Sequence, residues 1–209
     1  MRPSLILGRI LMNRRLFILS ITAFLAILQS GVILPPDSLE NWEILKDDEI
    51  WIGWKNVGEF DWCRSQSTLA APIADIRRII EDKENYPNIF KRIETTKIIT
   101  DEIVYIALDM PFPFAGRDYV VKYIQEQEDD KFIYRFHAVI HPEAPLHNKY
   151  VRLIHAAGEW RLTSIDSAKT EITYTWNGEL LGDFPDWALK RAWKQQGLEV
   201  MAWLQEAIK

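Results

Sequence analysis

Three histidines lie close together in the second half of the chain and raise the question of a metal site. His137 and His141 are four positions apart, and His147 follows six positions later. Residues at even spacing on a β-strand share one face, and three imidazoles would suit a catalytic zinc ion. However, two prolines between His141 and His147 mark a loop, and His137 alternates in step with Arg135, which we expect to face solvent. The pattern therefore predicts no metal site.

The sequence also lacks the short motifs of common catalytic centres. It contains no G-x-S-x-G turn of a serine hydrolase and no glycine-rich loop that could hold phosphate groups. Its one cysteine, Cys63, can form neither an internal disulfide bond nor a cysteine-based zinc site. We therefore expect no catalytic residues and no cofactor.

Aromatic residues, by contrast, recur on one face of several predicted strands. Over residues 118–126, Tyr119 and Tyr123 oppose the charged positions, which are expected to face solvent. Tyrosine and tryptophan offer an apolar face and one polar atom, which suits an amphipathic ligand. A solid core would use the same residues. The same alternation over 131–140, 159–165 and 171–177 points six more side chains inward: Phe132, Tyr134, Phe136, Trp160, Tyr174 and Trp176.

Three further residues complete the set of candidate ligand contacts. Trp193 and Met201 lie on the apolar stripe of a predicted helix over residues 185–208. Arg152 belongs to a predicted strand, and its guanidinium group would match the geometry of a ligand phosphate. In an acidic protein, Arg152 could equally form a surface ion pair.

Composition and charge limit the class of protein. The chain has 209 residues, of which 48% are hydrophobic and 26% charged, as expected for one folded domain. Four of its 25 basic residues precede residue 16, which leaves 21 basic against 30 acidic residues in the remainder. Because nucleic-acid binding requires a basic surface, we expect no nucleic-acid partner.

The first 34 residues have the pattern of a targeting segment. Residues 16–28 are uncharged and nearly all apolar, and they follow the pair Arg14-Arg15, as in a secretory signal. Extended to Leu34, the run is also about long enough to cross a bilayer. A cleaved signal, a retained membrane anchor and a buried N-terminal helix all remain open, and Met12 could be the true start. We expect export to the periplasm or the cell exterior and a folded domain over residues 38–209.

Periodicity in that domain predicts an α+β fold. We expect helices over residues 38–46, 72–83 and 185–208, with Gly197 interrupting the last. Short turns separate the predicted strands, which favours an antiparallel sheet of about nine strands. The strands are expected at 50–57, 61–69, 92–100, 102–109, 118–127, 131–140, 149–157, 159–165 and 170–178.

Several motifs in this order resemble the START (StAR-related lipid transfer) domain. They are the run from Pro111 to Val120 that contains Arg117-Asp118-Tyr119, then Tyr150-Val151-Arg152, Gly158-Glu159-Trp160, and Gly182 to Trp187. The resemblance covers about residues 40–209. It implies a helix-grip fold, in which a curved antiparallel sheet wraps around the C-terminal helix and encloses a hydrophobic tunnel for one lipid.

The resemblance also implies where the tunnel closes. The loop 141–148 corresponds to an Ω-loop that closes the tunnel mouth together with the C-terminal helix, and its gate residues would be His141, Pro142, Pro145, Leu146 and His147. Sterol-carrying members place an arginine six residues after the arginine of the Arg-Asp pair. This chain has Tyr123 there, which argues against sterol recognition.

The function expected from these observations is that of an exported, monomeric lipid-binding protein that holds one lipid, carries it and touches membranes transiently. Two alternatives use the same fold. One is an enzyme of the aromatase/cyclase type, which an inward acid or histidine with a catalytic partner would favour. The other is an interaction module with a filled core.

Export is the first testable expectation. Alkaline phosphatase folds only where disulfide bonds form, so a fusion after residue 37 is expected to be active in a bacterial host. A matched fusion that lacks residues 1–34 is the inactive control. Equal activity of the two fusions, or none from the longer one, would contradict export.

Overall fold

The structure is a computed structural model that describes residues 33–177 and 179–209. The predicted targeting segment, residues 1–34, lies almost entirely outside the described residues. Within the described part, no helix is both long and apolar enough to span a bilayer. Among the described residues, ten strands form one sheet, and the helices are α2 (Ile73–Glu81), the short 3-10 helix η1 (Lys83–Asn85), α3 (Tyr86–Ile89) and α4 (Asp186–Ala207), so the α+β prediction is confirmed.

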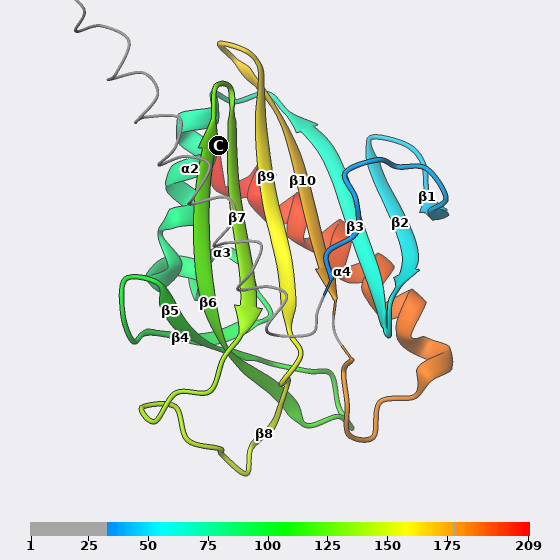
Figure 1. Ribbon diagram of the computed structural model, residues 1–209, viewed down its shortest axis with the longest axis vertical. Helices are drawn as coiled ribbons and strands as arrows, with labels where there is room; N and C mark the ends of the chain where they lie inside the picture. Colours follow the sequence, from blue (N-terminus) through cyan, green and yellow to red (C-terminus); the bar gives the residue numbers. More distant parts are fainter. Residues whose placement is uncertain (1–32, 178) are drawn as a thin grey trace, which may run out of the picture.

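The sheet is antiparallel apart from one short strand. Its order is β1-β2-β3-β10-β9-β7-β6-β5-β4, and β8 pairs in parallel with β6 off this path. Figure 1 shows the strands in front and α4 crossing behind them. The strands are β1 (Glu43–Lys46), β2 (Ile50–Val57), β3 (Phe60–Leu69), β4 (Ile93–Ile98), β5 (Ile103–Leu108), β6 (Gly116–Glu128), β7 (Lys131–Ala138), β8 (Tyr150–Arg152), β9 (Ala157–Asp166) and β10 (Lys169–Asn177).

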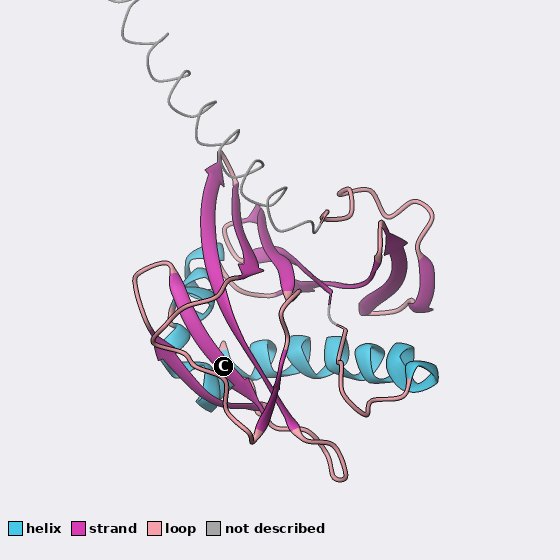
Figure 2. Ribbon diagram, turned by 60° about the horizontal axis from the view of Figure 1, so that its bottom comes forward, coloured by secondary structure: helices cyan, strands magenta, loops and turns pink. Residues whose placement is uncertain are grey.

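Helix α4 lies across one face of the sheet (Figure 2) and is continuous through Gly197, so the predicted interruption is wrong. A Cβ atom at Gly197 would lie 3.2 Å from the Trp176 ring and 3.3 Å from Ile52. The glycine therefore serves close packing between helix and sheet, which outweighs its low helix propensity. The predicted apolar stripe is buried at Trp193 and Met201.

The predicted helix over residues 38–46 is wrong. Asn41 has a φ of 61°, in the left-handed region, which stops a helix before it completes one turn. The chain then forms β1, which pairs with β2. The Nε1 atom of Trp42 donates a hydrogen bond to the Ser38 carbonyl at 3.1 Å and fixes this turn.

The predicted strand 149–157 is also largely wrong. Only Tyr150–Arg152 is extended against β6, and β9 begins later, at Ala157. Gly158 lies inside β9 rather than in a turn. A Cβ atom at this position would come within 2.4 Å of the Phe136 ring. Glycine is thus required where one strand's ring crosses its neighbour's backbone.

Segment 34–42 covers part of the face of the sheet opposite α4, so that part is not the open surface that alternation predicts. Arg64 donates hydrogen bonds to the carbonyls of Pro36 at 3.1 Å and Asp37 at 2.9 Å. Its burial lowers the pKa of the guanidinium group to about 10. Arg135 and His137 are correspondingly half-buried and buried, and burial lowers the pKa of the His137 imidazole. The packed part therefore begins before Ser38.

Candidate functional site

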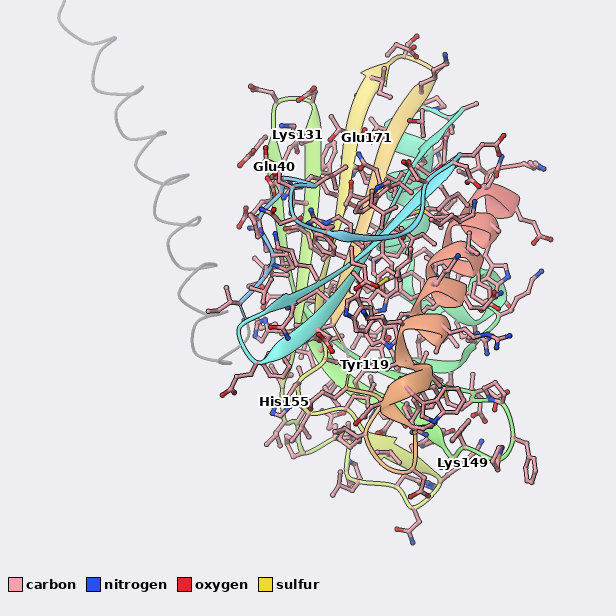
Figure 3. The ribbon with its side chains drawn as sticks, turned by 90° about the vertical axis from the view of Figure 1, so that its right-hand side faces the viewer. Glu40, Tyr119, Lys131, Lys149, His155 and Glu171 are labelled. Carbon is pink, nitrogen blue, oxygen red and sulfur yellow. The ribbon has the colours of Figure 1, made fainter. Side chains whose placement is uncertain are left out.

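A cavity of about 490 Å³ lies between α4 and the inner face of the sheet. Tyr119, one of its lining residues, is labelled in Figure 3, nearer the end of the molecule marked by His155 and Lys149 than the end marked by Lys131 and Glu171. The walls are mostly aromatic and aliphatic. Interiors are normally packed with few voids larger than a water molecule, so a space of this size marks a candidate binding site.

Five of the predicted contact residues line this cavity: Tyr119, Tyr123, Phe136, Trp160 and Tyr174. Strand alternation placed all five on the inner face. The rings of Trp160 and Tyr174, on neighbouring strands, stack with their centroids 4.0 Å apart and make one flat wall.

The other predicted contacts, on the inner face of the sheet and on α4, are not among the residues that line the cavity, and their contact with a ligand stays a prediction. Phe132 packs under the Arg77 guanidinium group, which is 4.0 Å from its ring centroid. The Tyr134 hydroxyl donates to Glu81 at 2.7 Å. Trp176 and Trp193 stack on each other at 5.4 Å in a separate core cluster. Met201 is buried in the main core.

Two loops that alternation did not single out border the cavity at one end, which we call the mouth. Loop 109–115 contributes Met110, Pro111 and Phe114, and segment 179–185 contributes Leu180 and Phe184. The rings of Phe114 and Phe184 meet with centroids 4.9 Å apart and join the two loops. Each loop carries phenylalanine and proline close to a glycine, but nothing in the sequence shows that the two loops meet.

The predicted gate loop, residues 141–148, is a separate segment from these two loops. None of the predicted gate residues His141, Pro142, Pro145, Leu146 and His147 is among those that line the cavity, and their role as a gate stays a prediction. The loop is held by hydrogen bonds from Arg152 to the carbonyls of Ala144 and Pro145, each at 3.2 Å.

Arg117 fixes the two mouth loops to the sheet. Its side chain is buried, and its guanidinium group donates to the carbonyls of Leu180 at 2.6 Å, Leu181 at 2.8 Å and Ala115. A buried guanidinium group needs acceptors for its N–H groups, so the loops can leave this position only if Arg117 loses its partners. Its burial lowers its pKa.

Arg152 is not a cavity residue and is not available to a ligand phosphate. It forms a two-point ion pair with Asp118, with both nitrogen–oxygen distances 2.8 Å. This hydrogen bonding raises the pKa of Arg152. The Asp118 side chain is 1% exposed, so the pair is the buried alternative to the surface ion pair considered from the sequence.

A second face of α4, offset from the predicted stripe, lines the cavity. Ala188, Ala192, Gln196, Val200 and Trp203 recur at helical spacing along it. The spacing is visible in the sequence. However, its first residues are small or polar, so they resemble surface positions and the pattern does not predict a cavity wall.

An ion pair holds the same part of α4 to the strand region before β4. Arg92 donates to both carboxylate oxygens of Glu199, at 2.5 and 2.9 Å. This hydrogen bonding raises the pKa of Arg92. Burial alone would raise the pKa of Glu199. The hydrogen bonds from Arg92 and Gln195 have the larger effect, so the pKa of Glu199 is lowered.

The polar side chains that line the cavity include tyrosine hydroxyls and the amide of Gln196. Tyr86 donates to the Ile80 carbonyl at 2.6 Å. Burial raises the pKa of Tyr119, Tyr123 and Tyr174 above that of an ordinary phenol, so all three are protonated at neutral pH. In the described ranges, no three histidine, cysteine or acidic side chains gather where they could hold a metal ion.

The family model of the START domain matches residues 66–206, which is more than half of the sequence. The chain therefore belongs to the START domain family. A relative from Pseudomonas aeruginosa, described as an uncharacterized protein, is 24% identical over 155 residues, which is 71% of this chain and 77% of that protein.

Solved structures share this fold at low sequence identity. A STAR-related lipid transfer protein from Xanthomonas axonopodis is 22% identical, with a TM-score of 0.71 over 81% of this chain and 99% of that chain. Human StAR-related lipid transfer protein 5 is 15% identical, with a TM-score of 0.77 over 94% of this chain and 97% of that chain. An aromatase/cyclase from a Streptomyces species is 21% identical, with a TM-score of 0.52 over 70% and 92%. The helix-grip fold is confirmed.

The role of Arg152 gives a second prediction. Arg152→Met leaves the buried Asp118 carboxylate without its partner and is expected to lower the free energy of unfolding by about 3–5 kcal/mol. Urea unfolding, monitored by tryptophan fluorescence, measures this change in the free energy of unfolding. The matched control is Lys149→Met, which removes an exposed ion pair with Glu94 and should change little. Unchanged stability combined with weaker ligand binding would instead make Arg152 a ligand contact.

Proposed function

We propose that this protein binds one single-chain or compact-ring lipid in the cavity and carries it between membranes. The observation that carries the proposal is a largely apolar, aromatic-lined cavity of about 490 Å³ between sheet and helix in a START-family chain. Apolar surface gains free energy when it leaves water, so such a wall favours a hydrophobic ligand over a polar one.

The size of the cavity narrows the ligand class. At roughly 30 Å³ for a water-sized group, 490 Å³ corresponds to about 16 such groups. One acyl chain or a few fused rings fill this space, whereas the two chains of a diacyl phospholipid need about twice as much. The ligand is accordingly a fatty acid, a fatty alcohol, a monoacyl lipid or a small polycyclic compound.

The mouth supports a transient contact with membranes. Phe112 on one mouth loop is 97% exposed, and Trp187 at the start of α4 is 83% exposed. Exposed aromatic rings of this kind favour the interface between lipid and water. Docking by this end brings the cavity mouth to the membrane surface, where a lipid passes without crossing bulk water.

A carrier fits the interior of the cavity better than an aromatase/cyclase. The ionisable groups of the described lining that lie inside are phenols whose pKa burial has raised, which makes them poor proton acceptors at neutral pH. The one lining carboxylate, Asp109, is exposed at the mouth. The chain is proposed to act outside the cytoplasm as a monomer, and the fusion experiment above tests its location.

Lipid exchange through the mouth is the direct test. In a Cys63→Ser background, a Phe114→Cys/Phe184→Cys variant cross-linked with a short bismaleimide joins the two mouth loops. We expect the uncross-linked protein to bind parinaric acid, a fluorescent single-chain fatty acid, at one saturable site, and the cross-link to slow its exchange with vesicles at least tenfold.

The control for this experiment is a His155→Cys/Glu179→Cys pair, because these side chains lie 3.0 Å apart outside the cavity. Its cross-link should leave exchange unchanged. Failure of parinaric acid to saturate a single site would overturn the proposed function. Equal exchange with and without the Phe114–Phe184 cross-link would show that lipid enters elsewhere.

A further inference from the structure

Two tyrosine hydroxyls in the cavity have no hydrogen-bond partner among the residues that the structure describes. They belong to Tyr119 on β6 and Tyr174 on β10. The Tyr86 hydroxyl beside them is engaged, since it donates to the Ile80 carbonyl at 2.6 Å, and the Tyr123 side chain lies close to it. Both side chains are only partly buried and line the cavity, so their hydroxyl groups are free to bond to a ligand there.

The surroundings of these hydroxyls carry no fixed charge. The inner wall around them is formed by rings such as Trp160 and Phe136 and by aliphatic side chains. The charged lining residues, Arg92, Asp109 and Arg191, belong to the mouth side, and Arg92 is already paired with Glu199. An ionised group moved into this interior would lose its hydration with no counter-charge to replace it.

We infer that Tyr119 and Tyr174 form a polar subsite for an uncharged hydroxyl or carbonyl group of the ligand. Phenols donate and accept hydrogen bonds, so they satisfy either group. The ligand class is therefore a single-chain or ring compound with a neutral polar group that lies inside the cavity. This inference rests on the proposed function and adds to it the chemistry of the bound group.

Removal of the two hydroxyls tests the subsite. A Tyr119→Phe/Tyr174→Phe double variant keeps both rings, and its affinities for lauryl alcohol and for dodecane are measured by displacement of parinaric acid. We expect lauryl alcohol to bind about 2- to 10-fold more weakly than to the wild type, the value of about one hydrogen bond, and dodecane to bind at least as tightly. The single variants divide the effect between the two tyrosines.

Tyr150→Phe is the matched control, because that hydroxyl donates to Glu94 outside the cavity and its loss should leave both affinities unchanged. Without ligand, the double variant should melt at the same temperature as the wild type or higher, since it loses two unpaired polar groups. A lower melting temperature would assign the hydroxyls a structural role and overturn the inference.

The outcomes also separate this inference from the proposed function. An equal change for lauryl alcohol and dodecane, or no change for either, would overturn the polar subsite while leaving the carrier intact. Wild-type protein that binds parinaric acid but not lauryl alcohol would do the same. Wild-type protein that binds none of the three probes would overturn both.

Discussion

The buried guanidinium group of Arg117 is the contact on which the form of the cavity mouth depends. Its hydrogen bonds to Ala115, Leu180 and Leu181 tie together two loops that are more than sixty residues apart in the sequence. The next residue, Asp118, pairs with Arg152 and holds the neighbouring loop, and the one after it, Tyr119, lines the cavity. Three consecutive residues of β6 thus hold the mouth loops, pair with the arginine that binds the neighbouring loop, and line the cavity.

The cavity itself results from uneven packing along α4. At Gly197 the helix comes close to the Trp176 ring on β10 and to Ser65 on β3, and Trp193 belongs to the same core cluster as Trp176. On its other face, small side chains such as Ala188 and Ala192 leave room between the helix and the sheet. The Arg92–Glu199 ion pair fixes the helix on that side without filling the gap. A helix packed tightly on one face and loosely on the other encloses space instead of a solid core.

Strand alternation in the sequence predicted the inner face correctly but not how far along each strand the cavity extends. Phe132, Tyr134 and Phe136 share a face, yet only Phe136 reaches the cavity, because α2 packs over the others through Arg77 and Glu81. The mouth could not be placed, since Arg117 contacts backbone carbonyls that leave no trace in side-chain patterns. The predicted interruption at Gly197 failed for the same reason, because a close helix–sheet contact depends on neighbours distant in sequence. The predicted helix over residues 38–46 failed locally, at the left-handed backbone of Asn41.

The central claim is that the space between α4 and the sheet holds one single-chain or compact-ring lipid. Native mass spectrometry of the protein purified from its own host, followed by extraction of the bound compound, tests this most directly. We expect one adduct per chain that is lost on denaturation, and its loss in Ala192→Trp, which fills the cavity, but not in the exposed control Ala202→Trp. An adduct with two acyl chains, or no adduct in any preparation, would contradict the account.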